Sequence, residues 1–394
     1  MDFRSLFNRE RRIYLDYASA TPLLPEVRRA MGKYWSEDFY NSSAIYAEGL
    51  KVKKDVEDFR SRVAKIIGVG SKEIVFTAGG TESINLAILG AFEESLKTFK
   101  KPHIIVSAIE HPAVVAAAEE VVRRGGELSG APVNEEGVIS LPAFKKLLKK
   151  STFLISIGLA NSEIGTIQPI AKIGRLVKEL RKERESSYPL LHTDASPCPS
   201  YLDIKLETLN SDLLTVDSSK IYGPKSAGIL ALRKGVKIHP IIFGGGQEKG
   251  RRAGTLNPAL IAGFTSALEA AIRDKESEAK RLEILRQRFI NHCVKRLPSI
   301  IVNGSSESHL PNIISISVPG ILGEFLLLRL EKRGVLVSVG SACSVDAQES
   351  GSPVIKALGK DDLKESTLRF SFGRFTTEDE LRRAAEIFVS TLNL

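Results

Sequence analysis

Three charged residues spread along this chain could together handle an amino acid bound to a cofactor. Lys220 stands where an apolar run at 213–216 ends, before the turn signal Gly223-Pro224. Asp194 lies upstream, after a short apolar stretch, and Arg369 lies downstream in another one. A lysine for a Schiff base, an aspartate for a pyridinium nitrogen and an arginine for a substrate carboxylate are the set that pyridoxal-phosphate (PLP) chemistry needs. Each residue alone is more often structural, but the combination predicts a PLP site.

A glycine-containing turn at residues 77–83 follows a predicted strand and precedes a predicted helix. Glycines let the backbone turn tightly, and the free amides at the start of a helix attract phosphate. Gly80 and Thr81 are therefore candidates for holding the phosphate of a cofactor. A plain helix cap at Thr81 explains the same residues, so this segment alone leaves both interpretations open.

The composition is that of a globular protein with room for two domains. The chain has 394 residues, of which 43% are hydrophobic and 26% charged. We find neither an apolar run long enough to span a membrane nor a secretory signal. The three cysteines are too scattered for a disulfide framework, which predicts a cytoplasmic protein. The net charge of +9 is spread over helical faces without a nucleic-acid motif, so we expect no direct contact with nucleic acid.

Short apolar runs alternate with amphipathic helical stretches through the first two thirds of the chain. This alternation predicts an α/β fold with a doubly wound, mostly parallel sheet, whose ligands gather at the carboxyl ends of the strands. We expect a large cofactor-binding domain over residues 14–258. The predicted strands are 74–76, 103–107, 153–157, 190–192, 213–216 and 229–232, and the predicted helices are 81–97, 113–124 and 170–184.

A second, smaller α+β domain is predicted over residues 259–394. It begins with a long connecting helix at 259–297, which carries apolar residues at helical spacing between dense charges. We expect residues 1–40 to pack beside this domain. Its predicted strands are 313–318, 335–337 and 367–372, and its other predicted helices are 322–333 and 378–392.

A set of motifs, in one order, extends from Tyr14 to the C-terminal part of the chain. They are Tyr14-Leu15-Asp16-Tyr17-Ala18, residues 41–49, 80–87, Glu110-His111, 161–165, 192–195, 220–225, 244–255, 340–344 and 368–376. In this order they resemble the cysteine desulfurases, which are PLP enzymes of aminotransferase class V. The resemblance implies the type I PLP-dependent transferase fold. It also implies that L-cysteine is the substrate and that the protein is a homodimer.

The resemblance assigns a role to each residue around the cofactor. It implies that Lys220 forms the Schiff base and later moves protons, while Asp194 pairs with the pyridinium nitrogen. It also implies that His111 stacks on the ring. The remaining cofactor contacts that it implies are Asn161 near the phenolic oxygen, Gly80, Thr81 and Ser219 at the phosphate, and Thr255 reaching across from a second subunit.

Substrate binding is implied for Arg369, whose planar guanidinium suits a bidentate pair with a carboxylate, and for Asn41 and Asn161 nearby. Taken singly, His111 before Pro112 could simply start a helix, and Asn161 could be a turn residue. Arg369 could likewise be a solvent-facing strand residue. We expect no metal site.

Cys343 lies among small and polar residues at 340–352, a composition typical of a loop. In the family this cysteine takes the sulfur of the substrate as a persulfide while alanine is released. An unperturbed thiol has a pKa near ~8.5, so a neighbouring cation or base is needed to raise its thiolate fraction. Cys198 and Cys293 are predicted to be structural.

Four departures from the family pattern concern mainly the cofactor contacts. Asp217 and Ser219 stand where the family has serine and histidine, which donate to the phosphate. Pro197 replaces a glutamine that donates to the phenolic oxygen. Ser42 and Tyr46 replace a proline and a histidine, and the Cys343 loop is slightly longer than the bacterial pattern. A carboxylate near the phosphate predicts weaker cofactor binding, because two like charges about 4 Å apart repel by roughly 4 kcal/mol at an effective dielectric of 20.

Three functional hypotheses follow. The first is a cysteine desulfurase that passes sulfur to an acceptor protein, such as an iron–sulfur scaffold or a sulfur carrier for tRNA thiolation. The second is a selenocysteine lyase or another class-V PLP enzyme, which does not need a sulfur-carrying Cys343. The third is a degenerate, non-catalytic relative that acts as a binding or scaffold protein, motivated by Asp217, Ser219 and Pro197. The first is favoured because Lys220, Asp194, His111, Arg369 and Cys343 are all present.

Overall fold

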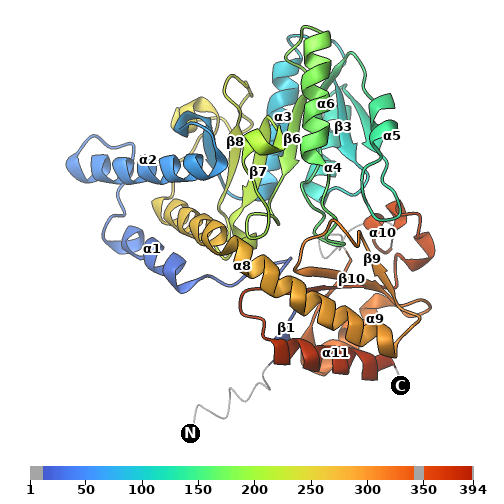
Figure 1. Cartoon of the computed structure of the whole chain (residues 1–394). Helices are drawn as coiled ribbons and strands as arrows, with labels where there is room; N and C mark the ends of the chain where they lie inside the picture. Colours follow the sequence, from blue (N-terminus) through green and yellow to red (C-terminus); the bar gives the residue numbers. More distant parts are fainter. Residues whose placement is uncertain (1–11, 341–349, 393–394) are drawn as a thin grey trace.

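A computed structural model describes residues 12–340 and 350–392 of the chain (Figure 1). Its centre is a seven-stranded sheet in the order β2-β8-β7-β6-β5-β3-β4. Strand β8 runs antiparallel to both of its neighbours, and the other pairs are parallel. The strands are β2 (Ile74–Thr77), β3 (His103–Ser107), β4 (Glu127–Ala131), β5 (Thr152–Ser156), β6 (Leu190–Asp194), β7 (Leu213–Asp217) and β8 (Gly228–Leu232).

Helices cover both faces of this sheet, so its inner strands are buried along their whole length and mostly apolar. Neighbouring residues of one strand enter different cores: Leu154 packs with the helices Gly80–Ser95 and Pro112–Arg123 on one face, and Ile155 packs with the helices Ala47–Ile67, Ile170–Glu183 and Pro258–Arg296 on the other. The helices of this domain are α1 (Pro25–Ser36), α2 (Ala47–Ile67), α3 (Gly80–Ser95), α4 (Pro112–Arg123), α5 (Leu141–Lys146), α6 (Ile170–Glu183) and α7 (Leu206–Leu209).

Helix α8 (Pro258–Arg296) connects the large sheet to a second layer (Figure 1). It starts at Asn257, whose side chain accepts a hydrogen bond from Leu260 N, followed by a proline in the first turn. Phe264 in its first half belongs to the core of the large sheet, whereas Phe289 in its second half belongs to the core of the smaller domain. The single helix therefore contributes to both cores.

The smaller domain has a four-stranded antiparallel sheet in the order β12-β13-β10-β9. A short parallel pair, β1-β11, lies beside it, so the start of the chain enters this domain. The N-terminal segment is shared, because Ile13 joins the small core and Val27 the large one. The elements are β1 (Ile13–Tyr14), β9 (Ile301–Asn303), β10 (Ile313–Ser317), β11 (Val335–Leu336), β12 (Ser338–Val339), β13 (Thr367–Ser371), α9 (Gly323–Lys332), α10 (Pro353–Ala357) and α11 (Glu378–Leu392).

The predicted α/β class with a mostly parallel sheet is confirmed. The sequence did not predict β4, an edge strand whose residues, apart from Leu128, are small or polar and which is mostly half-buried, because it lacks an apolar run. Helix α2 was also not predicted. Among the described residues, no helix is long and apolar enough to cross a membrane.

Candidate active site

The candidate site lies at the carboxyl ends of the central strands. Asp194 is the last residue of β6, and Asp217 is the last residue of the parallel neighbour β7. Strand β8 brings a third element to this edge, since its Gly228 lies opposite both Asp217 of β7 and Thr77 of β2. The register therefore sets the glycine turn after β2 against the end of β7.

Lys220 ends a single 3-10 turn, Ser218–Lys220, that directly follows β7. Its Nζ donates a hydrogen bond of 2.6 Å to the backbone oxygen of Ser19, and the side chain is partly buried. Its positive charge contributes to lowering the pKa of His111, so the ammonium group and this imidazole lie in the same site. The lysine is not directed into bulk water.

Asp194 is held by the residue two positions after it. Ser196 donates both its backbone N–H, at 3.0 Å, and its hydroxyl, at 2.6 Å, to Oδ1. Burial raises the pKa of Asp194 above its ordinary value, while the two Ser196 bonds and His111 act against that rise. These bonds leave Oδ2 free of Ser196, which suits a carboxylate that must face a cationic partner.

His111 is the N-cap of helix α4, because its Nδ1 accepts a hydrogen bond of 3.1 Å from Ala113 N. An accepting Nδ1 places the proton of the neutral ring on Nε2. Desolvation lowers the pKa of His111, Lys220 lowers it further, and Asp194 opposes both. The ring is therefore kept neutral close to the lysine. The structural and the functional interpretations of His111 are compatible, because one ring nitrogen suffices for the cap.

Arg369 is buried on β13, with 5% of its surface exposed, so the interpretation as a solvent-facing strand residue is wrong. Its Nη2 donates to Asp16 Oδ1 at 2.8 Å and to Ser19 Oγ at 2.7 Å. Its Nη1 donates to Ser162 O at 3.0 Å. Its buried Nε has no hydrogen-bond partner within the described residues, which leaves a donor for a ligand.

Ser19 links the arginine to the lysine. Its hydroxyl accepts from Arg369 and donates to Asp16 Oδ1 at 2.9 Å, while its carbonyl accepts from Lys220. Sequence reasoning did not select Asp16 or Ser19 as site residues. The available signal was their position in the first motif of the resemblance, at residues 14–18 and immediately after it.

The two asparagines make local turns. Asn161 accepts hydrogen bonds from the backbone N–H groups of Glu163 and Ile164. Its side-chain amide donates to Ile109 O at 2.8 Å, and Ile109 is two positions before His111 in the chain. Asn41 is exposed and accepts from Ser43 N at 2.9 Å. Thr255 is also exposed. Their roles toward substrate, cofactor or second subunit stay predictions.

The glycine turn after β2 contains a protein carboxylate. Gly80 N donates to Oδ2 of Asp217 at 2.7 Å, and Ser219 donates its N–H and hydroxyl to Oδ1 at 2.7 and 2.6 Å. Gly79 has a φ of 119°, a conformation that favours glycine. Thr81 is exposed at the start of α3. The groups predicted to hold a phosphate are thus brought together, but two of them, Gly80 and Ser219, bind Asp217.

Two further carboxyl groups, one half-buried and one buried, lie around the site and were not selected from the sequence. Glu110 accepts from Gly158 N at 3.0 and 3.2 Å, and burial raises its pKa to about 8, with a further contribution from Asp194. Glu163 accepts from the Ser352 hydroxyl, and burial raises its pKa to about 7. Glu110 directly precedes His111, and Glu163 follows Asn161 by two positions. This closeness in sequence was the signal available for them.

The cysteines fall into two groups. Cys198 and Cys293 are buried, and burial raises the pKa of both thiols, that of Cys293 to about 12. Neither can supply a thiolate near neutral pH. Cys343 lies outside the described residues.

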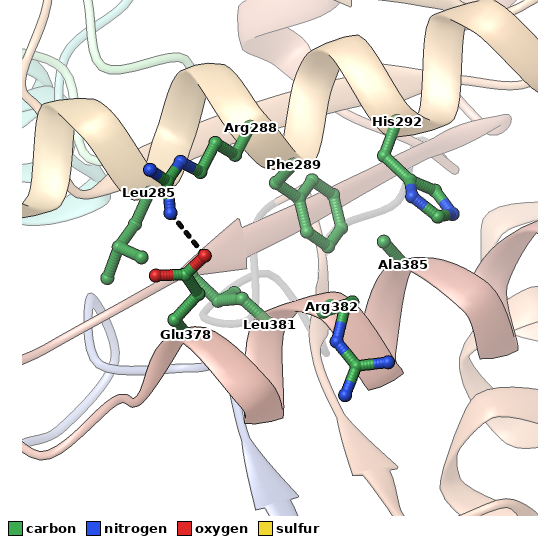
Figure 2. Close-up of a pocket in the computed structure, with 8 residues that line it drawn as sticks. All are labelled: Leu285, Arg288, Phe289, His292, Glu378, Leu381, Arg382 and Ala385. Carbon is green, nitrogen blue, oxygen red and sulfur yellow. Dashed lines mark hydrogen bonds and ion pairs between the residues drawn. The ribbon is translucent and has the colours of Figure 1, made fainter.

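A separate hollow of about 190 Å³ lies between α8 and α11 (Figure 2). Arg288 and Glu378 form an ion pair on its rim, and Phe289 lies at its base. It shares no residue with the site described above.

Comparison with known proteins shows the family of the chain. The model of the aminotransferase class-V family matches residues 13–383. Cysteine desulfurase IscS of Dictyoglomus turgidum is 42% identical over 381 residues, which cover 96% of this chain and 94% of that protein. Cysteine desulfurase IscS 1 of Archaeoglobus fulgidus is 36% identical over 375 residues, which cover 95% of this chain and 95% of that protein.

Solved structures give the same result. A NifS-like protein has a TM-score of 0.89 at 33% identity, and the match covers 97% of this chain and 99% of the chain of that protein. SspA in complex with cysteine has a TM-score of 0.79 at 32% identity, and the match covers 92% of this chain and 99% of the SspA chain. The resemblance inferred from the motifs is confirmed: the chain belongs to the aminotransferase class-V family and, within it, to the PLP-dependent cysteine desulfurases.

Proposed function

We propose that this protein converts L-cysteine to L-alanine and transfers the sulfur to Cys343, with PLP bound between Lys220 and Asp194. The ring end of the site fits this cofactor. A partly buried amine, a carboxylate held through one oxygen and a neutral imidazole lie together at the ends of two neighbouring strands. Lys220 would hold the aldehyde carbon, Asp194 the ring nitrogen and His111 one ring face. When bound, PLP supplies an electron sink for the substrate carbon.

The juxtaposition of Lys220 and Arg369 carries the proposal. Both donate to Ser19, one to its carbonyl and the other to its hydroxyl. In an α-amino acid the amino and carboxylate groups are attached to one carbon, so their binding groups must be neighbours. Arg369 provides the cation for the carboxylate, with its buried Nε available as a donor. Lys220 lies where the amino group would react.

The chain's own residues divide the work after binding. Arg369 orients the substrate, and Lys220, once its amine is released, moves a proton at the substrate carbon. Cys343 attacks the substrate sulfur: the carbon–sulfur bond breaks, a sulfur–sulfur bond forms on Cys343, and a proton completes alanine. His111 keeps its Nε2 proton available, because its Nδ1 is bound to Ala113 N.

The proposal includes a homodimer, an acceptor protein for the sulfur and a cytoplasmic location. Large apolar side chains are exposed along residues 35–45 and at 243, including Ile45 at 91% and Phe243 at 80% exposure. Exposed apolar side chains of this size support a subunit contact. Thr255 is exposed twelve positions after Phe243, consistent with a role toward a second subunit. The acceptor is proposed to be an iron–sulfur scaffold or a sulfur carrier.

Sulfide and alanine release from cysteine, with a thiol reductant, tests this function. We expect equal amounts of both products from the wild type and loss of both in Cys343→Ala, while the visible absorption of bound PLP persists. Sulfide release that survives Cys343→Ala would contradict the persulfide step. If that variant instead keeps activity toward selenocysteine alone, a selenocysteine lyase becomes the better assignment.

A further inference from the structure

The end of β7 carries an anion of its own in the phosphate-binding turn. Oδ2 of Asp217 accepts from Gly80 N at 2.7 Å, at the start of the 16-residue helix α3. A helix start with a free amide is where a phosphate gains most from the chain. In this protein that amide already binds a carboxylate.

The other oxygen of Asp217 occupies a second set of donors. Ser219 gives both its N–H and its hydroxyl to Oδ1, at 2.7 and 2.6 Å. Both carboxylate oxygens are therefore bound, one on each side of the turn. The fit is close, because a Cβ added at Gly80 would lie 3.1 Å from Oδ2 and 3.3 Å from the Asp217 Cβ. Asp217 is a fixed part of the turn.

The register of the sheet explains why Asp217 cannot simply face away. Asp217 and Thr77 are both opposite Gly228, so the end of β7 and the turn after β2 are held one strand apart. A Cβ at Gly228 would come within 2.8 Å of the Gly79 Cα, which shows how closely β8 and the turn approach. The carboxylate is thus kept beside the amides by backbone pairing as well as by its own hydrogen bonds.

A bound phosphate would have to share these donors with Asp217 or displace it. Sharing places two anions in one turn, and displacement breaks the three hydrogen bonds to the carboxylate. Arg252, whose guanidinium contacts this turn, is paired with Glu82 at 2.8 Å, and Glu82 also accepts from Ala78 N. The phosphate therefore contributes little net affinity here.

We propose that Asp217 substitutes for the cofactor's phosphate in this turn, so that the protein selects its cofactor by the ring and binds the phosphorylated and unphosphorylated aldehydes with little discrimination. This inference rests on the proposed cofactor site. It makes Asp217 a specificity-determining residue for the cofactor, and it makes pyridoxal a ligand of the site.

Spectroscopic titration of the apoprotein with PLP and with pyridoxal tests the proposal. The quantity compared is the ratio of the two affinities in the wild type and in Asp217→Asn, which removes the charge but keeps the shape. We expect the ratio to shift at least tenfold toward PLP in Asp217→Asn, with the pyridoxal affinity changed less than threefold. A ratio that stays within threefold of the wild-type ratio would overturn the proposal. Asp58→Asn, an exposed site on α2, has the same change of charge and is expected to leave the ratio unaltered.

Inorganic phosphate provides a second measurement that needs neither the ring nor activity. We expect millimolar phosphate to raise the midpoint of thermal unfolding of Asp217→Ser and Asp217→Asn by several degrees more than that of the wild type. Equal shifts in all three proteins would contradict the substitution of phosphate by Asp217. Loss of visible absorption with both aldehydes would instead contradict the proposed cofactor site, so the two failures are distinguishable.

Discussion

The two ends of the proposed cofactor site are built from the same sheet edge but differ in their electrostatics. At the ring end, Asp194 binds Ser196 through one oxygen, and Lys220 and His111 lie close by. At the phosphate end, both oxygens of Asp217 are bound to Gly80 and Ser219. The carboxylate of Asp194 has an oxygen available to a ligand. The carboxylate of Asp217 instead takes the place proposed for the phosphate of the cofactor.

This difference separates the groups that the reaction requires from the groups that bind the phosphate of the cofactor. The proposed reaction depends on an electron sink, a proton carrier and a carboxylate-binding cation, and Asp194, Lys220 and Arg369 are the residues proposed for these roles. In the proposed function the phosphate serves only to anchor the cofactor. The family chemistry can therefore persist in a chain whose anchor has changed, at the cost of affinity for the phosphate.

The largest expected effect is at the ring end. Asp194→Asn replaces the carboxylate that would keep a proton on the ring nitrogen with an amide that cannot balance its charge. We expect kcat to fall at least 100-fold, which is about 2.7 kcal/mol in the barrier, while the visible absorption of bound cofactor remains. Steady-state alanine formation measures this. Asp203→Asn, at an exposed aspartate, is the control. If kcat falls less than tenfold in Asp194→Asn, the ring end is not more important for the reaction than the phosphate end.

The half-buried Glu110 makes apoprotein stability depend on pH. Its pKa is about 8 in the folded state, because of burial and then Asp194, against an ordinary value of 4.5. Between these values the unfolded state has lost the proton and the folded state retains it, so the free energy of unfolding falls as pH rises from 4.5 to 8 and then levels off. Below pH 4.5 both states are protonated and the group has no effect.

Glu110→Gln cannot ionise and should remove this part of the pH dependence. We expect the variant to gain up to about 3.5 kcal/mol on the wild type between pH 5 and pH 8, measured by urea unfolding. Glu119→Gln, exposed on α4, serves as the control. The account of the ring end as a desolvated site would be wrong if the two proteins lost stability in parallel with rising pH.

The smallest effect is expected in the turn at the phosphate end. Glu82 accepts from Ala78 N at 2.8 Å and pairs with Arg252, and both side chains are largely buried. Glu82→Gln keeps the shape but weakens both contacts, which should cost about 1 kcal/mol in the free energy of unfolding. Thermal unfolding measures the change. No loss of stability would show that Asp217 alone holds the turn.

Much of this arrangement could be predicted from the sequence where the determinants are local. Asp194 and Lys220 follow apolar runs that form β6 and β7, and parallel strands bring their carboxyl ends to one edge. The position of Asp217 before Lys220 predicted a carboxylate near the proposed phosphate site. The direct bond to Gly80 could not be, because it depends on β8 inserting antiparallel between β2 and β7.

The remaining site depends on contacts that join distant parts of the chain. The bond from Arg369 to Asp16 spans 353 positions, and that from Lys220 to Ser19 spans 201. Neither pairing leaves a periodic pattern in the sequence. The sequence left the burial of Arg369 open for a related reason: an arginine flanked by Leu368 and Phe370 is typical of an alternating surface strand, and here both faces of β13 are covered.

The visible absorption spectrum after adding PLP, in the wild type and in Lys220→Ala, tests the central claim most directly. The account predicts an absorption band from a Schiff base in the wild type, its loss in Lys220→Ala, and its retention in Lys225→Ala, an exposed lysine five positions away. A band that survives Lys220→Ala, or a wild type that stays colourless with both PLP and pyridoxal, would contradict it.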